Sequence, residues 1–143
     1  MKHSIKKCLF ILLLPFIFSW THIPNNNIKE GKYRFTCQFV NDKSGSVSVY
    51  SQNDTLFLKA STIAIDTASF VVMKGHIEKI EKDSFVFVGK IRTYAGDACC
   101  GYIVKNGAWT FRRMLNRNFY RLKERDSLCD CYTCCFYIDI HLK

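Results

Sequence analysis

The cysteines are the side chains of this sequence with the most evident chemistry. Eight are present, and six of them gather in two short segments, 99–100 and 129–135. In an oxidising compartment such a set predicts structural disulfides, although the sequence does not choose among the connectivities. Neighbouring cysteines rarely bond each other, so we expect first a bridge between the two segments, from Cys99 or Cys100 to Cys129 or Cys131. The disulfide candidates are Cys99, Cys100, Cys129, Cys131, Cys134 and Cys135.

Other chemistry for these thiols remains open at this point. Four clustered cysteines could hold zinc, but Cys131 and Cys134 supply only one of the two C-x-x-C pairs of a typical structural site. The same spacing fits a redox motif, which needs a helix N-terminus that the pattern does not predict here. Free thiols or intermolecular bonds are further alternatives. We expect disulfides, without metal or cofactor. Cys37 stands apart between Phe35 and Phe39 and is predicted to be buried as a small apolar side chain.

A second candidate surface is a basic patch near residue 120, in which aromatic side chains interleave with cations. Such a pattern can suit nucleic acid, but for an exported protein an anionic lipid or glycan surface fits better, and we expect no nucleic acid. The alternative is an ordinary solvated strand face. We find no catalytic set and predict that the protein is not an enzyme. The patch consists of Arg112, Arg113, Arg117, Arg121, Lys123 and Arg125.

The chain has 143 residues and a formal net charge of +9, and its first part has the composition of an export signal. Lys2, Lys6 and Lys7 precede an apolar run over residues 8–20. That run is shorter than the roughly 20 residues of a membrane-spanning helix and fits a signal peptide over residues 1–21. An uncleaved, tethering signal is the alternative. Residues 22–30 would be a linker and 31–143 a single domain, secreted or periplasmic, that meets a membrane only through the signal.

Alternating apolar and polar residues fill the remainder of the chain. Residues 31–40, 55–61 and 85–94 show this period of two, which is typical of half-buried strands. Turn residues recur between such runs, and Asn106-Gly107 is a strong hairpin signal. Gly75 and Gly89 lie inside strands, as glycines do where a sheet bends. The prediction is an all-β antiparallel meander that closes into an up-and-down β-barrel of about 8–10 strands, behind an N-terminal signal helix.

A family resemblance is consistent with this fold. The motifs are Gly89-Lys90-Ile91, Trp109-x-Phe111, Phe119-Tyr120-Arg121-Leu122 and Tyr137-Ile138-Asp139-Ile140. Over roughly residues 70–140 the chain resembles small secreted lipocalin-like proteins of Gram-negative bacteria. The resemblance implies a calycin-type barrel and carries over no catalytic residue.

Two functions follow from a small barrel. It could hold a small apolar ligand among its inward aromatic side chains, or those side chains could simply fill it. Alternatively, it could be a structural or interaction protein of the cell surface that uses the basic patch or the cysteine-rich segment. The ligand-lining candidates are Tyr33, Phe35, Phe39, Phe85, Phe87, Trp109 and Phe111.

Overall fold

The computed structural model describes residues 27–38, 40, 44–63, 68–96, 101–128 and 137–142. Within them lie eight strands and one short 3₁₀ turn. The strands are β1 (Gly31–Cys37), β2 (Gly45–Gln52), β3 (Thr55–Ile63), β4 (Phe70–Ile80), β5 (Ser84–Tyr94), β6 (Tyr102–Arg113), β7 (Phe119–Leu122) and β8 (Ile138–His141), and the 3₁₀ turn η1 spans Arg125–Leu128. No helix in these ranges has the length and apolar composition of a membrane span.

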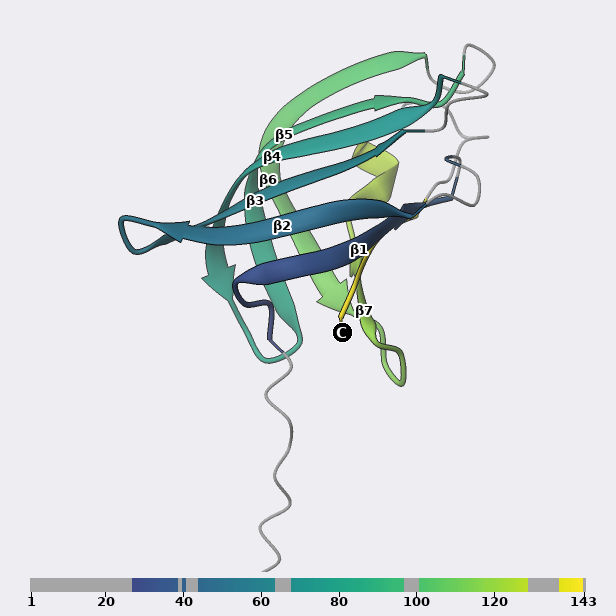
Figure 1. The fold of residues 1–143 in the computed structure, drawn as a ribbon. Coiled ribbons are helices and arrows are strands. Elements are labelled where there is room, and N and C mark those ends of the chain that lie inside the picture. The colour runs from purple at the N-terminus through teal and green to yellow at the C-terminus, as the bar shows by residue number, and fades with distance from the viewer. Residues whose placement is uncertain are drawn as a thin grey trace, which may run out of the picture.

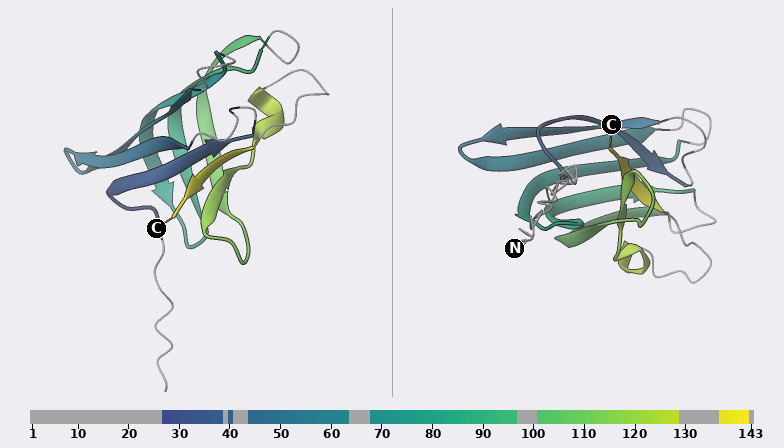
Figure 2. Two further views of the ribbon diagram at one scale, coloured as in Figure 1. Left: turned by 45° about the vertical axis from the view of Figure 1, so that its right-hand side comes forward. Right: turned by 90° about the horizontal axis from the view of Figure 1, so that it is seen from below.

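The eight strands form a closed antiparallel barrel in sequence order, with β8 pairing back onto β1 (Figure 1). This arrangement confirms the predicted all-β meander. β2 to β6 form a long, curved wall, whereas β7 and β8 are short, and β8 lies between β7 and β1 (Figure 2). Closure leaves few exposed sheet edges, which limits unwanted pairing with other chains.

The strands form because their side chains alternate between the barrel interior and the outside. In β5, Phe85, Phe87 and Ile91 are each 0% exposed, whereas Lys90 and Arg92 on either side of Ile91 are exposed. The same alternation puts Val47 and Val49 of β2 inside. A helix would scatter these residues around its axis, so the period of two selects the strand.

The predicted hairpin at Asn106-Gly107 is wrong. β6 runs straight through both residues, which pair with Lys90 and Gly89 of β5. The long register between β5 and β6 outweighs the local preference of the dipeptide for a turn, because a turn there would give up the continuous pairing of β6 with β5. β4 is likewise one continuous strand through Gly75, which the sequence placed inside a strand.

Gly75 and Gly89 lie directly opposite each other where β4 and β5 approach closely. A Cβ atom on either residue would lie 2.7 Å from the Cα of the other and 2.7 Å from the ring of Phe87. Neither distance is tolerable for a real Cβ atom. The bend that the sequence assigned to these glycines is therefore a place where two backbones and an inward aromatic ring meet.

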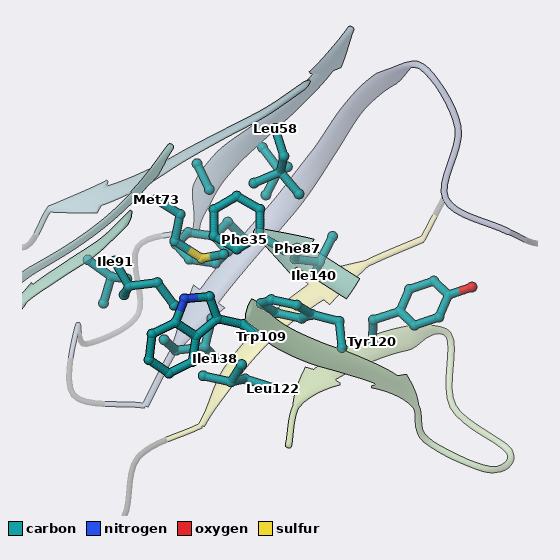
Figure 3. Close-up of a cluster of buried hydrophobic side chains, with 14 of the residues drawn as sticks. Phe35, Leu58, Met73, Phe87, Ile91, Trp109, Tyr120, Leu122, Ile138 and Ile140 are labelled. Carbon is teal, nitrogen blue, oxygen red and sulfur yellow. The ribbon is translucent and has the colours of Figure 1, made fainter. Parts of the chain in front are cut away.

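The barrel interior is filled by aromatic and branched aliphatic side chains (Figure 3). Phe85 stacks on Phe111 with ring centroids 5.1 Å apart and meets Tyr120 edge-on at 5.2 Å. Trp109 donates its indole N–H to the carbonyl of Gly89 at 3.3 Å, so its polar atom is satisfied inside. Ile28, in the segment before β1, is 1% exposed and belongs to the same core.

β7 is much shorter than β6, and beyond its end a side chain supplies a hydrogen-bond acceptor to the backbone of β6. Beyond Leu122 the chain leaves the sheet, and Lys123 N–H donates to the Thr110 carbonyl at 2.8 Å. The Glu124 carboxylate then accepts the Thr110 N–H at 2.7 Å. It replaces a strand partner, which explains how a strand ends here without leaving this backbone donor unpaired.

Candidate functional site

The ligand-lining candidates that the structure describes lie in the core cluster or, in the case of Tyr33, pack against it. Phe35, Phe85, Phe87 and Phe111 are 0% exposed and Trp109 is 5% exposed, so these rings pack against other side chains. Tyr33 is partly buried, and its hydroxyl accepts the Lys29 N–H and donates to the Lys29 carbonyl. The described rings therefore act as packing.

Several predictions concern residues outside the described ranges. They include the signal segment 1–21, Phe39 and all six disulfide candidates (Cys99, Cys100, Cys129, Cys131, Cys134 and Cys135). Cys37 is described and is 6% exposed within the core, which confirms its predicted burial. Among the described residues no group of three or more His, Cys, Asp or Glu side chains is placed to hold a metal ion.

The basic patch is divided among different environments. Arg121 makes two 2.8 Å hydrogen bonds to Asp139 directly across β7 and β8. This interaction raises the pKa of Arg121, first through the hydrogen bonds. Arg121 is therefore committed to holding two strands together.

Two further cations of the patch, Arg117 and Arg125, lie over aromatic rings. The guanidinium of Arg121 lies 3.9 Å from the Tyr137 ring centroid, with Arg125 at 4.8 Å from the same ring. Arg117 lies 5.8 Å from the Phe119 ring. Arg113 is half-buried at one end of β6, while Arg112 and Lys123 are exposed. The patch thus forms a cation–aromatic stack and scattered charges instead of one open stripe.

His141 extends this stack to the seam between β1 and β8. Its Nδ1 lies 3.1 Å from the Arg34 guanidinium and its Nε2 lies 2.8 Å from Thr36 Oγ1. Because a guanidinium only donates, Nδ1 accepts, and the ring is neutral with its proton on Nε2. Burial, and then the positive charge of Arg34, lower the pKa of His141, whereas Asp139 acts in the opposite direction.

A concave surface lies on the outside of the barrel wall. This outer groove has a volume of about 590 Å³ and crosses β2 to β6. Its walls combine three exposed cations with aromatic and β-branched side chains. The lining residues are Tyr50, Phe57, Val72, Lys74, Gly75, Lys90, Arg92, Tyr102 and Val104.

Strand register explains why these residues meet. Lys59, Lys74 and Lys90 occupy one row, because Lys59 pairs with Lys74 and Lys74 pairs with Lys90. We call these three residues the lysine row. Arg92 lies two positions further along β5 and shares their outward face. In the part of the chain that the structure describes, no carboxylate forms an ion pair with any of these four cations.

Aromatic rings flank the cations on both sides. Towards one end, Tyr50 stacks on Phe57 at 5.7 Å, and the ammonium of Lys59 lies 5.3 Å from the Tyr50 ring. Towards the other end, Phe70 contacts Tyr94 at 6.3 Å and Tyr102 at 6.1 Å. Tyr102 and Val104 remain exposed apolar residues. The groove can therefore accept a ligand that joins negative charge to apolar surface.

Comparison with known proteins places this architecture in a family. Residues 24–142 match the PM1083 family. The chain belongs to this family. One member, "Uncharacterized protein PM1083" of Pasteurella multocida (strain Pm70), is 31% identical over 116 residues, which cover 77% of this chain and 71% of the relative. No solved structure matches the chain. The match to the PM1083 family spans the whole barrel. Neither the family match nor the similar protein indicates a lipocalin.

The outer groove was not anticipated from the sequence. Its cations belong to two neighbouring strands and the lysine row to three, and only the pairing between strands reveals that these side chains lie together. The available signal was the outward parity of Lys59, Lys74, Lys90 and Arg92. Parity within a strand does not give the register between strands, so this signal was not sufficient.

Proposed function

We propose that this protein is an exported, non-catalytic barrel that binds a small amphipathic ligand in its outer groove. The observation that carries the proposal is the set of exposed cations, Lys74, Lys90 and Arg92, beside the apolar side chains of Val72 and Val104. A groove that combines apolar surface with a few convergent polar groups is the usual form of a ligand site. The close packing of Phe85, Phe87 and Phe111 favours this wall over the barrel interior.

Export is the second part of the proposal. It rests on the charged and apolar pattern of residues 1–21. Intact mass measurement of protein recovered from the producing cells tests it, and we expect a chain that has lost this segment. A full-length chain confined to the cytoplasm would contradict export.

Native mass spectrometry of the protein purified without denaturant tests ligand binding. We expect an additional small-molecule mass on the wild-type chain. Val104→Asp should abolish this adduct, because the new carboxylate enters the groove and opposes an anionic ligand. Ala108→Asp is the matched control, since Ala108 is also exposed on the outer side of β6 but does not line the groove.

The outcomes separate the alternatives. An adduct that persists in Val104→Asp would place the ligand elsewhere and contradict the proposed site. A wild-type protein without any adduct would support the structural or interaction role and contradict ligand binding.

A further inference from the structure

The lysine row places like charges directly opposite each other on three adjacent strands. Lys74 lies between Lys59 on β3 and Lys90 on β5, and all three side chains are exposed. Directly opposed like charges destabilise a sheet. Lys59 partly avoids the conflict by lying over the Tyr50 ring, but Lys74 and Lys90 both remain at the groove.

Arg92 strengthens the positive potential at this point. It lines the groove with Lys74 and Lys90, so three cations from two neighbouring strands surround one volume of about 590 Å³. Val72 and Val104 provide low-polarity walls beside them, which strengthen electrostatic attraction relative to open water. A bound anion would offset the repulsion within the row.

The number of cations favours an anion with more than one charge. A phosphate monoester carries a charge of about −1.5 to −2 at neutral pH and offers three acceptor oxygens. An arginine fork together with lysine point charges is the usual protein partner of such a group. A carboxylate or a sulfate ester carries a single negative charge and would offset less of the repulsion within the row.

The apolar neighbours indicate what the phosphate is attached to. Tyr102 is 60% exposed and Val104 is 43% exposed, and both line the groove next to the cations. Exposed apolar side chains at a binding groove gain free energy when a ligand covers them. We therefore infer that the outer groove recognises a phosphorylated amphiphile. Its phosphate monoester lies among Lys74, Lys90 and Arg92, and its apolar chain lies against Val104 and Tyr102.

This inference rests on the proposed function, and calorimetric titration with short amphiphiles tests the two separately. The probes are octyl phosphate, octyl sulfate and octyl glucoside below their critical micelle concentrations, together with inorganic phosphate. We expect octyl phosphate to bind at least about tenfold more tightly than each other probe, a difference of about 1.4 kcal/mol. Its affinity should fall between pH 8 and pH 5.5 as the phosphate gains a proton, whereas that of octyl sulfate should not.

Charge-removing variants locate the phosphate. Lys90→Gln and Arg92→Gln should each weaken octyl phosphate binding about tenfold and reduce its salt dependence. Lys32→Gln is the matched control, because Lys32 is exposed on β1 and does not line the groove. Circular dichroism of each variant checks that the barrel is retained.

Three results would overturn the inference. Equal affinity for octyl glucoside would show groove binding without phosphate recognition, which leaves the proposed function intact. Equal affinity for inorganic phosphate would remove the role of the apolar chain. Absence of saturable binding by every probe would overturn the inference, and if native mass spectrometry also finds bare protein, the proposed function falls with it.

Discussion

At the scale of single residues, the pair Arg121–Asp139 joins β7 to β8 through two hydrogen bonds. Asp139 is only 8% exposed, so its carboxylate depends on the two hydrogen bonds from Arg121. We expect Asp139→Asn to lower the free energy of unfolding by about 1–3 kcal/mol, because a charged partner is left with a weaker acceptor. Urea denaturation of the two proteins measures this difference.

Asp126 provides the matched control for that variant. Its side chain is 81% exposed and lies 3.6 Å from Arg125. Asp126→Asn should change the stability by less than about 0.5 kcal/mol. Equal losses in both variants would show that the contact between β7 and β8 has no more effect than a surface ion pair.

His141 gives the barrel a pH dependence with a definite sign. Its folded-state pKa is lowered, so on acidification the unfolded chain takes up a proton before the folded chain does. Stability is therefore retained above the unfolded pKa of about 6.5 and falls as the pH drops through the lower folded pKa. Urea denaturation between pH 7.5 and pH 5 measures this loss.

Two variants test the physical cause of that loss. His141→Gln should flatten the pH dependence in this range. Arg34→Gln should reduce it, since the nearby positive charge that lowers the pKa of His141 is gone. Lys32→Gln removes a charge from the same strand without touching His141 and should leave the slope unchanged. An unchanged slope in His141→Gln would contradict this origin.

At the scale of secondary-structure elements, the close approach of β4 and β5 depends on glycine. Gly75→Ala should destabilise the protein by about 1–3 kcal/mol, because the new methyl group would meet the backbone of Gly89 and the ring of Phe87. Gly107→Ala is the control within the same sheet. A Cβ there would lie 3.6 Å from Trp109, an ordinary contact, so the change should be neutral or stabilising by up to about 1 kcal/mol.

Thermal unfolding of the two alanine variants measures these effects. A Gly75→Ala protein as stable as Gly107→Ala would mean that β4 and β5 separate at little cost. In that case the bend would tolerate a side chain, contrary to the geometry described.

The comparison of these elements also explains what the sequence could and could not predict. Alternation within one strand predicted the inward side chains of β1, β3 and β5, because burial has the same period as the strand. The dipeptide Asn106-Gly107 gave a wrong hairpin prediction. Its turn preference is local, whereas eleven residue pairs hold β5 against β6. The lysine row escaped notice for the related reason that register is a property of two strands.

At the scale of the whole molecule, the segment before β1 is part of the barrel. Ile28 is buried, and Lys29 exchanges two hydrogen bonds with Tyr33. A chain beginning at residue 24 should therefore unfold at a clearly higher urea concentration than one beginning at residue 31. Ile28→Ala in the longer chain should lower the free energy of unfolding by about 2–4 kcal/mol, as for other truncations of buried aliphatic side chains.

Glu30→Ala is the control for this segment, because Glu30 is exposed. It should leave the urea midpoint nearly unchanged. Identical midpoints for chains beginning at residues 24 and 31 would show that Ile28 contributes nothing to the barrel.

The pairing of β1 with β8 has a consequence for how the barrel folds. Arg34 and His141 meet although 107 residues separate them along the chain. The hairpins β2–β3, β4–β5 and β5–β6 need only short loops, whereas this last pairing must close nearly the whole domain into a ring. Closing a longer loop costs more chain entropy, and non-local pairing slows folding. The seam is therefore expected to form last, and until it does, β1 and the end of the meander remain open edges that can pair with other chains.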